Sequence, residues 1–189
     1  MQNLTVADVN ADISMLMEGF SSDKRIVPSS SHLLKMSVTL PLTAISLSFL
    51  SAVIIFLTGY KVELTLLSFF DYFLSDGWIF VAPTIVVGLL FSLMTYNNIM
   101  LYLAVPEDIR QKSLLLSHFK LLAKRTILLF LKLMVAAIFL SGVSTWFAFA
   151  ISGLLFALLF IVSLIVGSEI NRLGVGIVVD KISSLVKSI

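Results

Sequence analysis

Long uncharged segments alternate with shorter charged ones along this chain. Residues 38–59 and 78–103 contain no charged side chain, and residues 126–167 contain only Lys132. A helix that crosses a bilayer needs about 20 mostly apolar residues, so each of the first two segments predicts one such helix. The third segment has 42 residues, and as one helix it would extend about 63 Å, roughly twice the thickness of the hydrocarbon core. It must therefore fold back, and small polar residues with a glycine at 141–145 mark the turn.

The pattern predicts an all-α membrane protein with four transmembrane helices, at about 38–59, 78–103, 126–141 and 146–167. An N-terminal segment (1–35) precedes this membrane domain (36–173), and a tail (174–189) follows it. A transmembrane β-barrel would instead need short segments of alternating hydrophobicity. The observed runs are continuous, which excludes that alternative.

Composition supports the same class of protein. Hydrophobic residues make up 59% of the 189 residues and charged residues only 13%, whereas soluble domains carry about 25% charged residues. This is too little charge to cover a water-facing surface, and a formal net charge of +2 does not favour nucleic-acid binding. The chain has no cysteine, which excludes disulfides, thiolate metal sites and thiol nucleophiles.

The distribution of Lys and Arg predicts the orientation. Three of the 13 lie in the leader, five in the link at 104–125 and three after the last predicted span, at Arg172, Lys181 and Lys187, whereas Lys61 alone lies on the opposite side. The positive-inside rule therefore places both termini in the cytoplasm. The first 35 residues contain four acidic residues and no apolar segment behind a basic start, so we expect no cleaved signal peptide, and the first membrane helix serves as its own insertion signal.

The leader contains a predicted amphipathic helix. Thr5 can cap its start, with Asp8 three residues on as a capping box. The apolar stripe consists of Val9, Ile13, Leu16, Met17 and Phe20, and the acidic face of Asp8, Asp12 and Glu18. Because a helix that lies on anionic lipid is usually basic, we expect this one to dock against the chain's own basic link or against a partner. The alternative is a frayed leader that only packs on its own bundle.

The cytoplasmic link at 104–125 predicts a second amphipathic helix, a basic one, that begins at Pro106 and continues into the third membrane helix. Two roles are open for it. It can anchor that helix at the anionic cytoplasmic leaflet, or dock a cytoplasmic ligand through residues such as Arg110 and Lys112. The tail has Gly174 and Gly176, which break helix, and then a further amphipathic stretch.

The first outer loop, at 61–77, combines aromatic with acidic residues and is too short and interrupted to span. The simplest interpretation of this loop is a helix that lies in the outer interface of the bilayer. The alternative is an exposed recognition patch, because clustered aromatic residues make good binding anchors. The candidate partner-binding residues are Glu63, Phe69, Phe70, Asp71, Tyr72 and Asp76 in this loop, with Asp8, Asp12, Arg110 and Lys112 on the cytoplasmic side.

Small residues recur every four positions in the predicted membrane helices. They are Ala44, Ser48 and Ala52, then Thr84, Gly88 and Ser92, then Gly153 with Ala157 and Ser163 with Gly167. Such stripes let helix backbones approach closely, within a compact bundle or in a homo-oligomer. Pro41 and Pro83 fall near the predicted helix starts, where a missing N–H costs little.

Few residues within the predicted spans suggest chemistry. Lys132 is expected to snorkel to the cytoplasmic headgroups, or else to act with Asn97 and Asn98 in a functional role. His32 and His118 have no partner at metal-ligand spacing, so we expect both to be plain polar residues. No catalytic or phosphate-binding motif is present. The sequence thus predicts a protein that is not an enzyme, has no metal or cofactor, and works by contact.

Two short segments carry a resemblance to a known family. Arg25-Ile26-Val27-Pro28-Ser29 before the first membrane helix and Val105-Pro106-Glu107-Asp108-Ile109-Arg110-Gln111-Lys112-Ser113 in the link, together with the four-pass layout, resemble the entry-exclusion proteins of F-type conjugative plasmids, the TraS family. The resemblance implies an inner-membrane protein of a plasmid-bearing cell. It would block redundant conjugative DNA transfer by recognising a mating-pair protein of the donor, called TraG in that family.

Two other functions remain open. An immunity protein against a pore-forming bacteriocin would have a similar size and layout, and would contact the toxin within the bilayer through its small-residue stripes. A small transport or secretion subunit would need Lys132, Asn97 and Asn98 to line a path.

Overall fold

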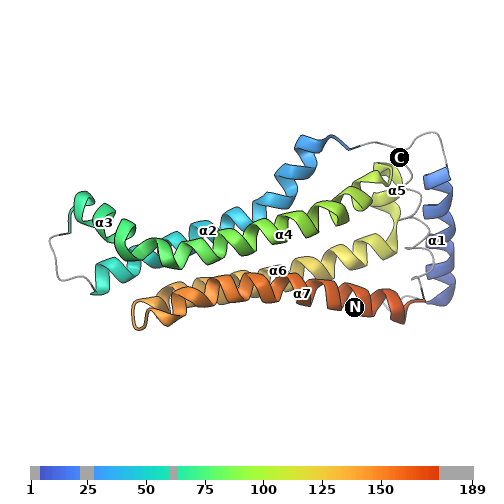
Figure 1. The fold of residues 1–189 in the computed structure, drawn as a ribbon. Coiled ribbons are helices and arrows are strands. Elements are labelled where there is room, and N and C mark those ends of the chain that lie inside the picture. Colours follow the sequence, from blue (N-terminus) through green and yellow to red (C-terminus); the bar gives the residue numbers. More distant parts are fainter. Residues whose placement is uncertain (1–4, 22–27, 60–63, 175–189) are drawn as a thin grey trace.

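The computed structural model describes residues 5–21, 28–59 and 64–174 (Figure 1). Within these residues the chain forms α-helices, one π-helical turn and no strand, which confirms the expected all-α class. The elements are α1 Val6–Ser21, α2 Ser30–Gly59, α3 Leu66–Tyr72, η1 Phe73–Gly77, α4 Trp78–Ala104, α5 Glu107–Lys112, α6 Leu114–Ser141 and α7 Trp146–Arg172. The expectations for Lys61, for Glu63 and for the tail beyond Gly174 lie outside the described residues.

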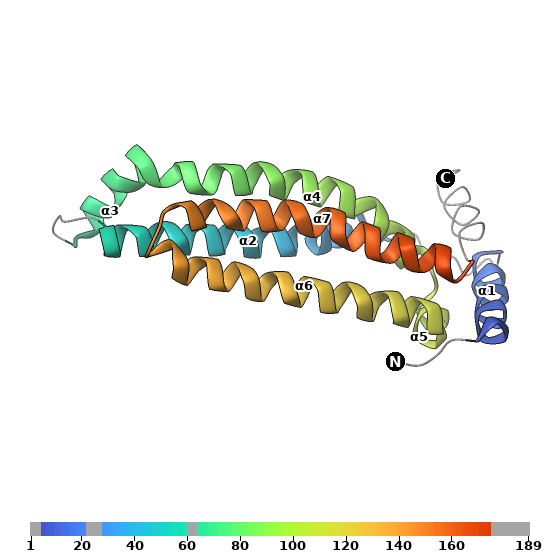
Figure 2. The ribbon, with the colours of Figure 1, turned by 90° about the horizontal axis from the view of Figure 1, so that it is seen from below.

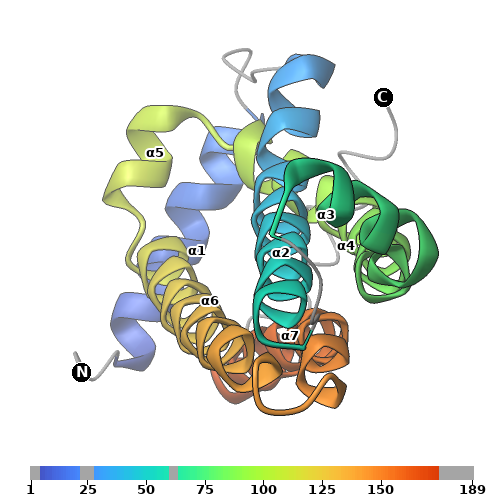
Figure 3. The same cartoon turned by 90° about the vertical axis from the view of Figure 1, so that its left-hand side faces the viewer.

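The helices α2, α4, α6 and α7 lie side by side as an antiparallel bundle, because the chain reverses direction between each of these helices and the next (Figures 1 and 2). α2 packs mainly on α4, and α6 on α7. Seen along the bundle, α2 lies between α4 and α6 (Figure 3). The reversals bring α1, α5 and the end of α7 to one end of the bundle, and α3 and the α6–α7 turn to the other.

Three described helical segments are long and apolar enough to cross a membrane: α2, the continuous segment Leu66–Ala104 that ends with α4, and α7. α2 begins eight residues before the expected span, and α7 continues five residues beyond it. α6 also exceeds its expected span, since it begins at Leu114. Lys124, Arg125 and Lys132 interrupt its apolar character.

The expected turn after Ser141 is confirmed. α6 ends at Ser141 and α7 begins five residues later. The N–H of Val143 donates to the carbonyl of Leu140 over 2.9 Å. Gly142 lies close to α2, because a Cβ added there would be 3.1 Å from Cγ2 of Ile54. The turn therefore sits tightly against the end of α2.

α2 and α4 meet through the small residues that recur every four positions, which confirms this part of the prediction. The small residues of both stripes are buried, namely Ala44, Ser48, Ala52, Thr84, Gly88 and Ser92. Of these, Ser48, Thr84 and Gly88 lie against the facing helix. The hydroxyl of Thr84 donates to Oγ of Ser48 over 3.2 Å, and the hydroxyl of Ser48 donates to the carbonyl of Phe80 over 2.8 Å. Such bonds between membrane helices contribute about 0.6 kcal/mol on average, so close backbone packing dominates the contact.

Pro41 lies inside α2, and this corrects the expectation that it falls near a helix start. α2 begins eleven residues earlier, at Ser30. A proline within a helix removes a backbone hydrogen bond and bends the helix, and the first part of α2 turns away from the bundle in Figure 1. Its ring packs on α4, because a Cβ added to Gly88 would lie 3.2 Å from Cβ of Pro41. Pro83 likewise lies inside a continuous helical segment that begins at Leu66.

The centre of the bundle is filled by apolar side chains. Met134 of α6 and Ile151 and Leu155 of α7 are fully buried there, and they pack with Ala44 of α2 and Phe91 of α4. The outer faces of the same helices also carry large apolar side chains, including Leu89, Phe139 and Leu164. Extensive exposed apolar surface is unusual for a soluble monomer, and is compatible with contact to membrane lipid.

Gly174 ends α7, as the sequence predicts. Its φ is 68°, in the left-handed region that glycine adopts at low cost after a helix. The N–H of Gly174 donates to the carbonyl of Asn171 over 3.1 Å, and the N–H of Leu173 donates to the carbonyl of Glu169 over 3.0 Å. These bonds satisfy the last carbonyls of the helix.

Candidate functional site

α1 lies across one end of the bundle (Figures 1 and 2). Val9 and Leu16 of its apolar stripe are buried against Ala104, Val105 and Leu115, where α4 ends and α6 begins. α1 contacts both α5 and α6. The expectation that this helix docks on the chain's own basic link is therefore confirmed.

Asp12 joins α1 to the start of α6. Its side chain accepts hydrogen bonds from the hydroxyl of Ser113 at 2.7 Å and from the backbone N–H groups of Leu114 at 3.2 Å and Leu115 at 2.9 Å. The first N–H groups of a helix lack partners within the helix, and a negative charge is favourable there. Asp12 therefore caps α6 from a different part of the chain.

This contact corrects the assignment of Asp12 to the solvent-exposed acidic face. Asp12 is only 5% exposed. It follows Val9 by three residues and precedes Leu16 by four, so all three share one side of the helix. An acidic residue within an apolar stripe is the sequence signal that points to such a buried cap. As a candidate for binding a partner, Asp12 is already engaged within its own chain.

The basic link is two helices rather than one, which corrects a second expectation. α5 ends at Lys112, and α6 begins at Leu114. Ser113 between them has an extended backbone, and its Oγ accepts from the N–H of Leu116 over 3.1 Å. The serine cap thus starts a new helix where the amphipathic pattern predicts a continuous one. Of the two candidate basic residues, Lys112 is exposed, and the guanidinium of Arg110 lies 5.0 Å from the ring centroid of Tyr102.

The capping box at the start of α1 is confirmed. The N–H of Asp8 donates to Oγ1 of Thr5 over 3.2 Å, and the N–H of Thr5 donates to Oδ2 of Asp8 over 3.1 Å. The hydroxyl of Thr5 also donates to Oδ2 of Asp8 over 2.6 Å. These bonds stabilise the ionised carboxylate, and the hydroxyl of Thr5 is the main cause of a lowered pKa of Asp8. Asp8 is exposed, so it remains accessible to a partner.

His118 and Glu169 connect α6 to α7 at the same end of the bundle. Nε2 of His118 lies 3.0 Å from Oε1 of Glu169, and both side chains are mostly buried. Arg172, one turn further along α7, donates to the same carboxylate oxygen. The sequence pattern gives His118 no acidic partner, because Glu169 is 51 residues away. Glu169 was not among the candidate residues. It precedes Arg172 by three residues at the end of an apolar segment, and this spacing could have indicated an ion pair on one face of a helix.

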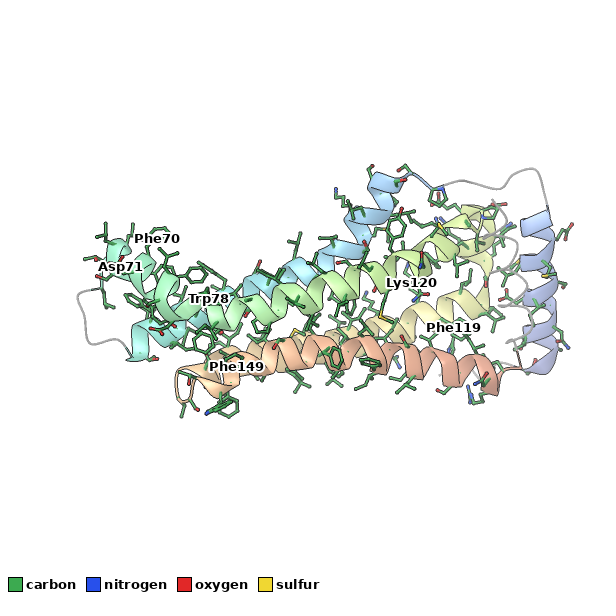
Figure 4. All side chains as sticks on the ribbon, in the orientation of Figure 1. Phe70, Asp71, Trp78, Phe119, Lys120 and Phe149 are labelled. Carbon is green, nitrogen blue, oxygen red and sulfur yellow. The ribbon has the colours of Figure 1, made fainter. Side chains whose placement is uncertain are left out.

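At the other end, the structure divides the candidate patch of the first outer loop. Phe69 and Tyr72 face α2, where their rings pack on Phe56 with centroids 5.4 Å apart in each case. Phe70 and Asp71 are exposed on α3 (Figure 4), and Asp76 is exposed in η1. The loop is therefore helical from Leu66 to Gly77, and only part of its aromatic cluster is displayed. This division follows from helical periodicity, which turns neighbouring residues to different sides.

The candidate polar residues of the membrane domain lie on its outside. Lys132 is exposed on α6, and Asn97 and Asn98 are exposed on α4. Lys132 follows Arg125 by seven residues, nearly two helical turns, so the two side chains share one face of α6. None of the three reaches the packed apolar centre, and this arrangement does not support a transport path lined by them.

Comparison of the chain with protein-family models, with curated proteins and with solved structures finds no match.

Proposed function

We propose that this chain is a multi-pass protein of the bacterial inner membrane that acts by contact with another protein. Its resemblance to the TraS family gives the contact a role in entry exclusion, in which recognition of a donor mating-pair protein of the TraG type blocks redundant conjugative DNA transfer. One observation carries the proposal. The middle of the bundle is packed with apolar side chains, whereas one end holds the bonds of Asp12 and the pair His118 and Glu169, and the other end holds an aromatic cluster around Phe56. A bundle of this kind suits a rigid support that presents its ends to a partner.

We further propose four membrane passes with both termini in the cytoplasm. The antiparallel arrangement of four long helices supports this number, because α6 has 28 residues, about 42 Å, and matches its neighbours in length. Lys132 can extend toward the headgroups near Arg125, which makes its position in a membrane helix tolerable. Reporter fusions at residue 70 and after residue 189 should report opposite compartments. The same compartment for both would contradict the four-pass arrangement.

Of the three surfaces suggested by the sequence, the outer end fits a partner from another cell best. The acidic helix α1 uses Asp12 within the chain, and it covers part of the basic link. The outer end instead displays the exposed carboxylates of Asp71 and Asp76. We therefore propose that these carboxylates contribute to recognition of a basic segment of the donor protein.

The test is a mating assay with the full chain expressed in a plasmid-free recipient. We expect a lower frequency of conjugation from a matching donor and unchanged transformation by naked DNA. An unchanged conjugation frequency, with the protein present in the membrane, would contradict entry exclusion.

A pair of matched double variants then tests the surface. Asp71→Asn with Asp76→Asn should weaken exclusion. Glu107→Gln with Asp108→Asn removes two exposed carboxylates at the opposite end of the bundle, and should leave exclusion unchanged at equal protein abundance. Equal exclusion by both double variants would show that the acidic outer residues do not contribute.

Immunity against a pore-forming bacteriocin is the second candidate, and one observation favours it. Two glycines of the small-residue pairs in α7 leave open surface, although Ala157 packs against the apolar centre. A Cβ added to Gly153 or Gly167 would meet no atom within 4 Å, so the surface there is open to another helix. In this case the protein should protect cells from a colicin, Gly153→Leu should abolish the protection, and mating should be unaffected.

A further inference from the structure

The outward surface of α3 and η1 carries a row of large apolar side chains. Leu66, Leu67, Phe70 and Leu74 are 81%, 77%, 60% and 74% exposed. Leu66 and Leu67 precede Phe70 by four and three residues and Leu74 follows it by four, which places the four side chains along one flank of the helix. Exposure of this degree at four neighbouring positions needs a cover other than water.

A polar flank runs beside this row. Ser68, Asp71 and Ser75 recur at the same helical spacing, offset from the apolar row. Asp71 and Ser75 are exposed, and Oγ1 of Thr65 accepts the N–H of Ser68 at the start of α3 over 3.2 Å. The outward surface of α3 is therefore itself amphipathic, with one flank suited to a hydrocarbon environment and the other suited to water.

The inward side of α3 fixes the direction of both flanks. The ring of Phe69 packs on Phe49 and Phe56 of α2, with centroids 5.9 and 5.4 Å apart. Phe73 adds a contact to Phe49 at 5.4 Å. Edge-to-face aromatic pairs are favourable beyond the area that they bury. These contacts hold the helix against rotation, so the apolar row cannot turn inward.

The apolar row also continues into the outer face of the bundle. α3, η1 and α4 form one continuous helical segment, and α3 turns aside from the axis of α4 across the end of the bundle (Figures 1 and 2). Trp78 and Ile79 are exposed where α4 begins, and tryptophan is enriched at the level of the lipid headgroups. Further along α4, Val86, Leu89 and Leu93 extend the exposed apolar surface.

We infer that α3 is an interfacial anchor: Leu66, Leu67, Phe70 and Leu74 insert into the outer leaflet, while Asp71 and Ser75 face water. Lipid therefore covers these four apolar side chains. A helix of this kind buries its apolar face about 5–10 Å into the boundary between headgroups and acyl chains. The inference rests on the four-pass arrangement proposed above. It also deepens the proposed function, since lipid covers Phe70 and leaves a partner only the acidic flank at this end.

Site-directed spin labelling in lipid nanodiscs tests the inference, and the absence of native cysteine makes every single-cysteine variant unambiguous. Leu67→Cys and Leu74→Cys probe the apolar flank, and Asp71→Cys and Ser75→Cys probe the polar flank. Leu89→Cys serves as a reference within α4, and Asp108→Cys as a reference in α5. The measured quantity is the ratio of collision rates with oxygen, which concentrates in lipid, to those with a water-soluble nickel chelate.

We expect a high ratio at Leu67→Cys, Leu74→Cys and Leu89→Cys, and a low ratio at Asp71→Cys, Ser75→Cys and Asp108→Cys. A low ratio at both apolar-flank positions would place that flank in water and overturn the inference. Low collision rates with both reagents there would indicate cover by protein, and would overturn it as well. A low ratio at Leu89→Cys would overturn the membrane arrangement itself, which separates that failure from a failure of the anchor alone.

Discussion

Asp12 and Ser113 are 101 residues apart in the sequence, yet the carboxylate of Asp12 accepts a hydrogen bond from the hydroxyl of Ser113 over 2.7 Å. The same serine caps α6 by accepting the N–H of Leu116. α1 and the start of α6 are therefore built as one unit. α1 belongs to the fold of the bundle end rather than being a loosely attached segment.

Removal of the Asp12 carboxylate should loosen α1. In Asp12→Ala the N–H groups of Leu114 and Leu115 lose their acceptor in a buried position, which costs about 1–3 kcal/mol. We expect a lower unfolding temperature of the detergent-solubilised protein and faster hydrogen exchange throughout α1. The exposed residue Asn10 on the same helix provides the control, since Asn10→Ala should change neither quantity. Unchanged exchange in Asp12→Ala would mean that the apolar contacts of α1 suffice.

The two glycines at equivalent places in their stripes should respond differently to a large side chain. At Gly88 even a Cβ would lie 3.2 Å from Pro41, whereas a Cβ at Gly153 would meet no atom within 4 Å. Gly88→Leu should therefore push α2 and α4 apart and cost about 1–3 kcal/mol, measured as a lower unfolding temperature. Gly153→Leu should leave the unfolding temperature nearly unchanged. Equal destabilisation by both substitutions would refute the assigned α2–α4 interface.

The pair His118 and Glu169 should couple energetically. A double-mutant cycle with His118→Ala and Glu169→Gln should give an interaction free energy of about 0.5–3 kcal/mol, because the two side chains touch and are mostly shielded from water. The same cycle with Lys120→Ala in place of His118→Ala serves as the control. Lys120 is exposed two residues further along α6 (Figure 4), so its coupling to Glu169 should be close to zero. A coupling as large as that of His118 would point to a general charge effect.

The capping box of α1 should depend on pH. Because the pKa of Asp8 is lowered by the hydroxyl of Thr5, the contact contributes to stability above the pKa of the unfolded chain, and the contribution disappears as the pH falls through the folded pKa. Thr5→Val removes the hydroxyl and should raise the pKa of Asp8 toward its usual value. Carboxyl NMR titration of Asp8 in both proteins measures the shift. Identical titration curves would contradict the role assigned to Thr5.

Several features could be predicted from the sequence because they depend on local spacing. The capping box needs only Thr5 and Asp8 three residues apart, and the α6–α7 turn needs only an apolar run too long for one bilayer crossing. Small residues every four positions predicted faces for close helix packing on α2 and α4, but not that these two helices pack on each other. Each of these signals lies within a single helix or a single turn.

Other features of the candidate site could not be predicted, since they depend on which helix ends meet. The partner of Asp12 is 101 residues away, and that of His118 is 51 residues away. The outer loop shows the same limit, because its sequence identified an aromatic cluster but not the side that packs on α2. The contact of α3 with Phe49 and Phe56 leaves Phe69 half-buried and Phe70 exposed.

By itself, the sequence determined the helical class, the apolar segments and where the chain turns back. Those properties follow from hydrophobicity and helical spacing, which act over a few neighbouring residues. The tertiary structure alone decided that Asp12 caps α6, that Glu169 binds His118, and that Lys132, Asn97 and Asn98 face outward. The reason is that the rotation and order of packed helices are set by contacts between distant segments, and no local pattern encodes them.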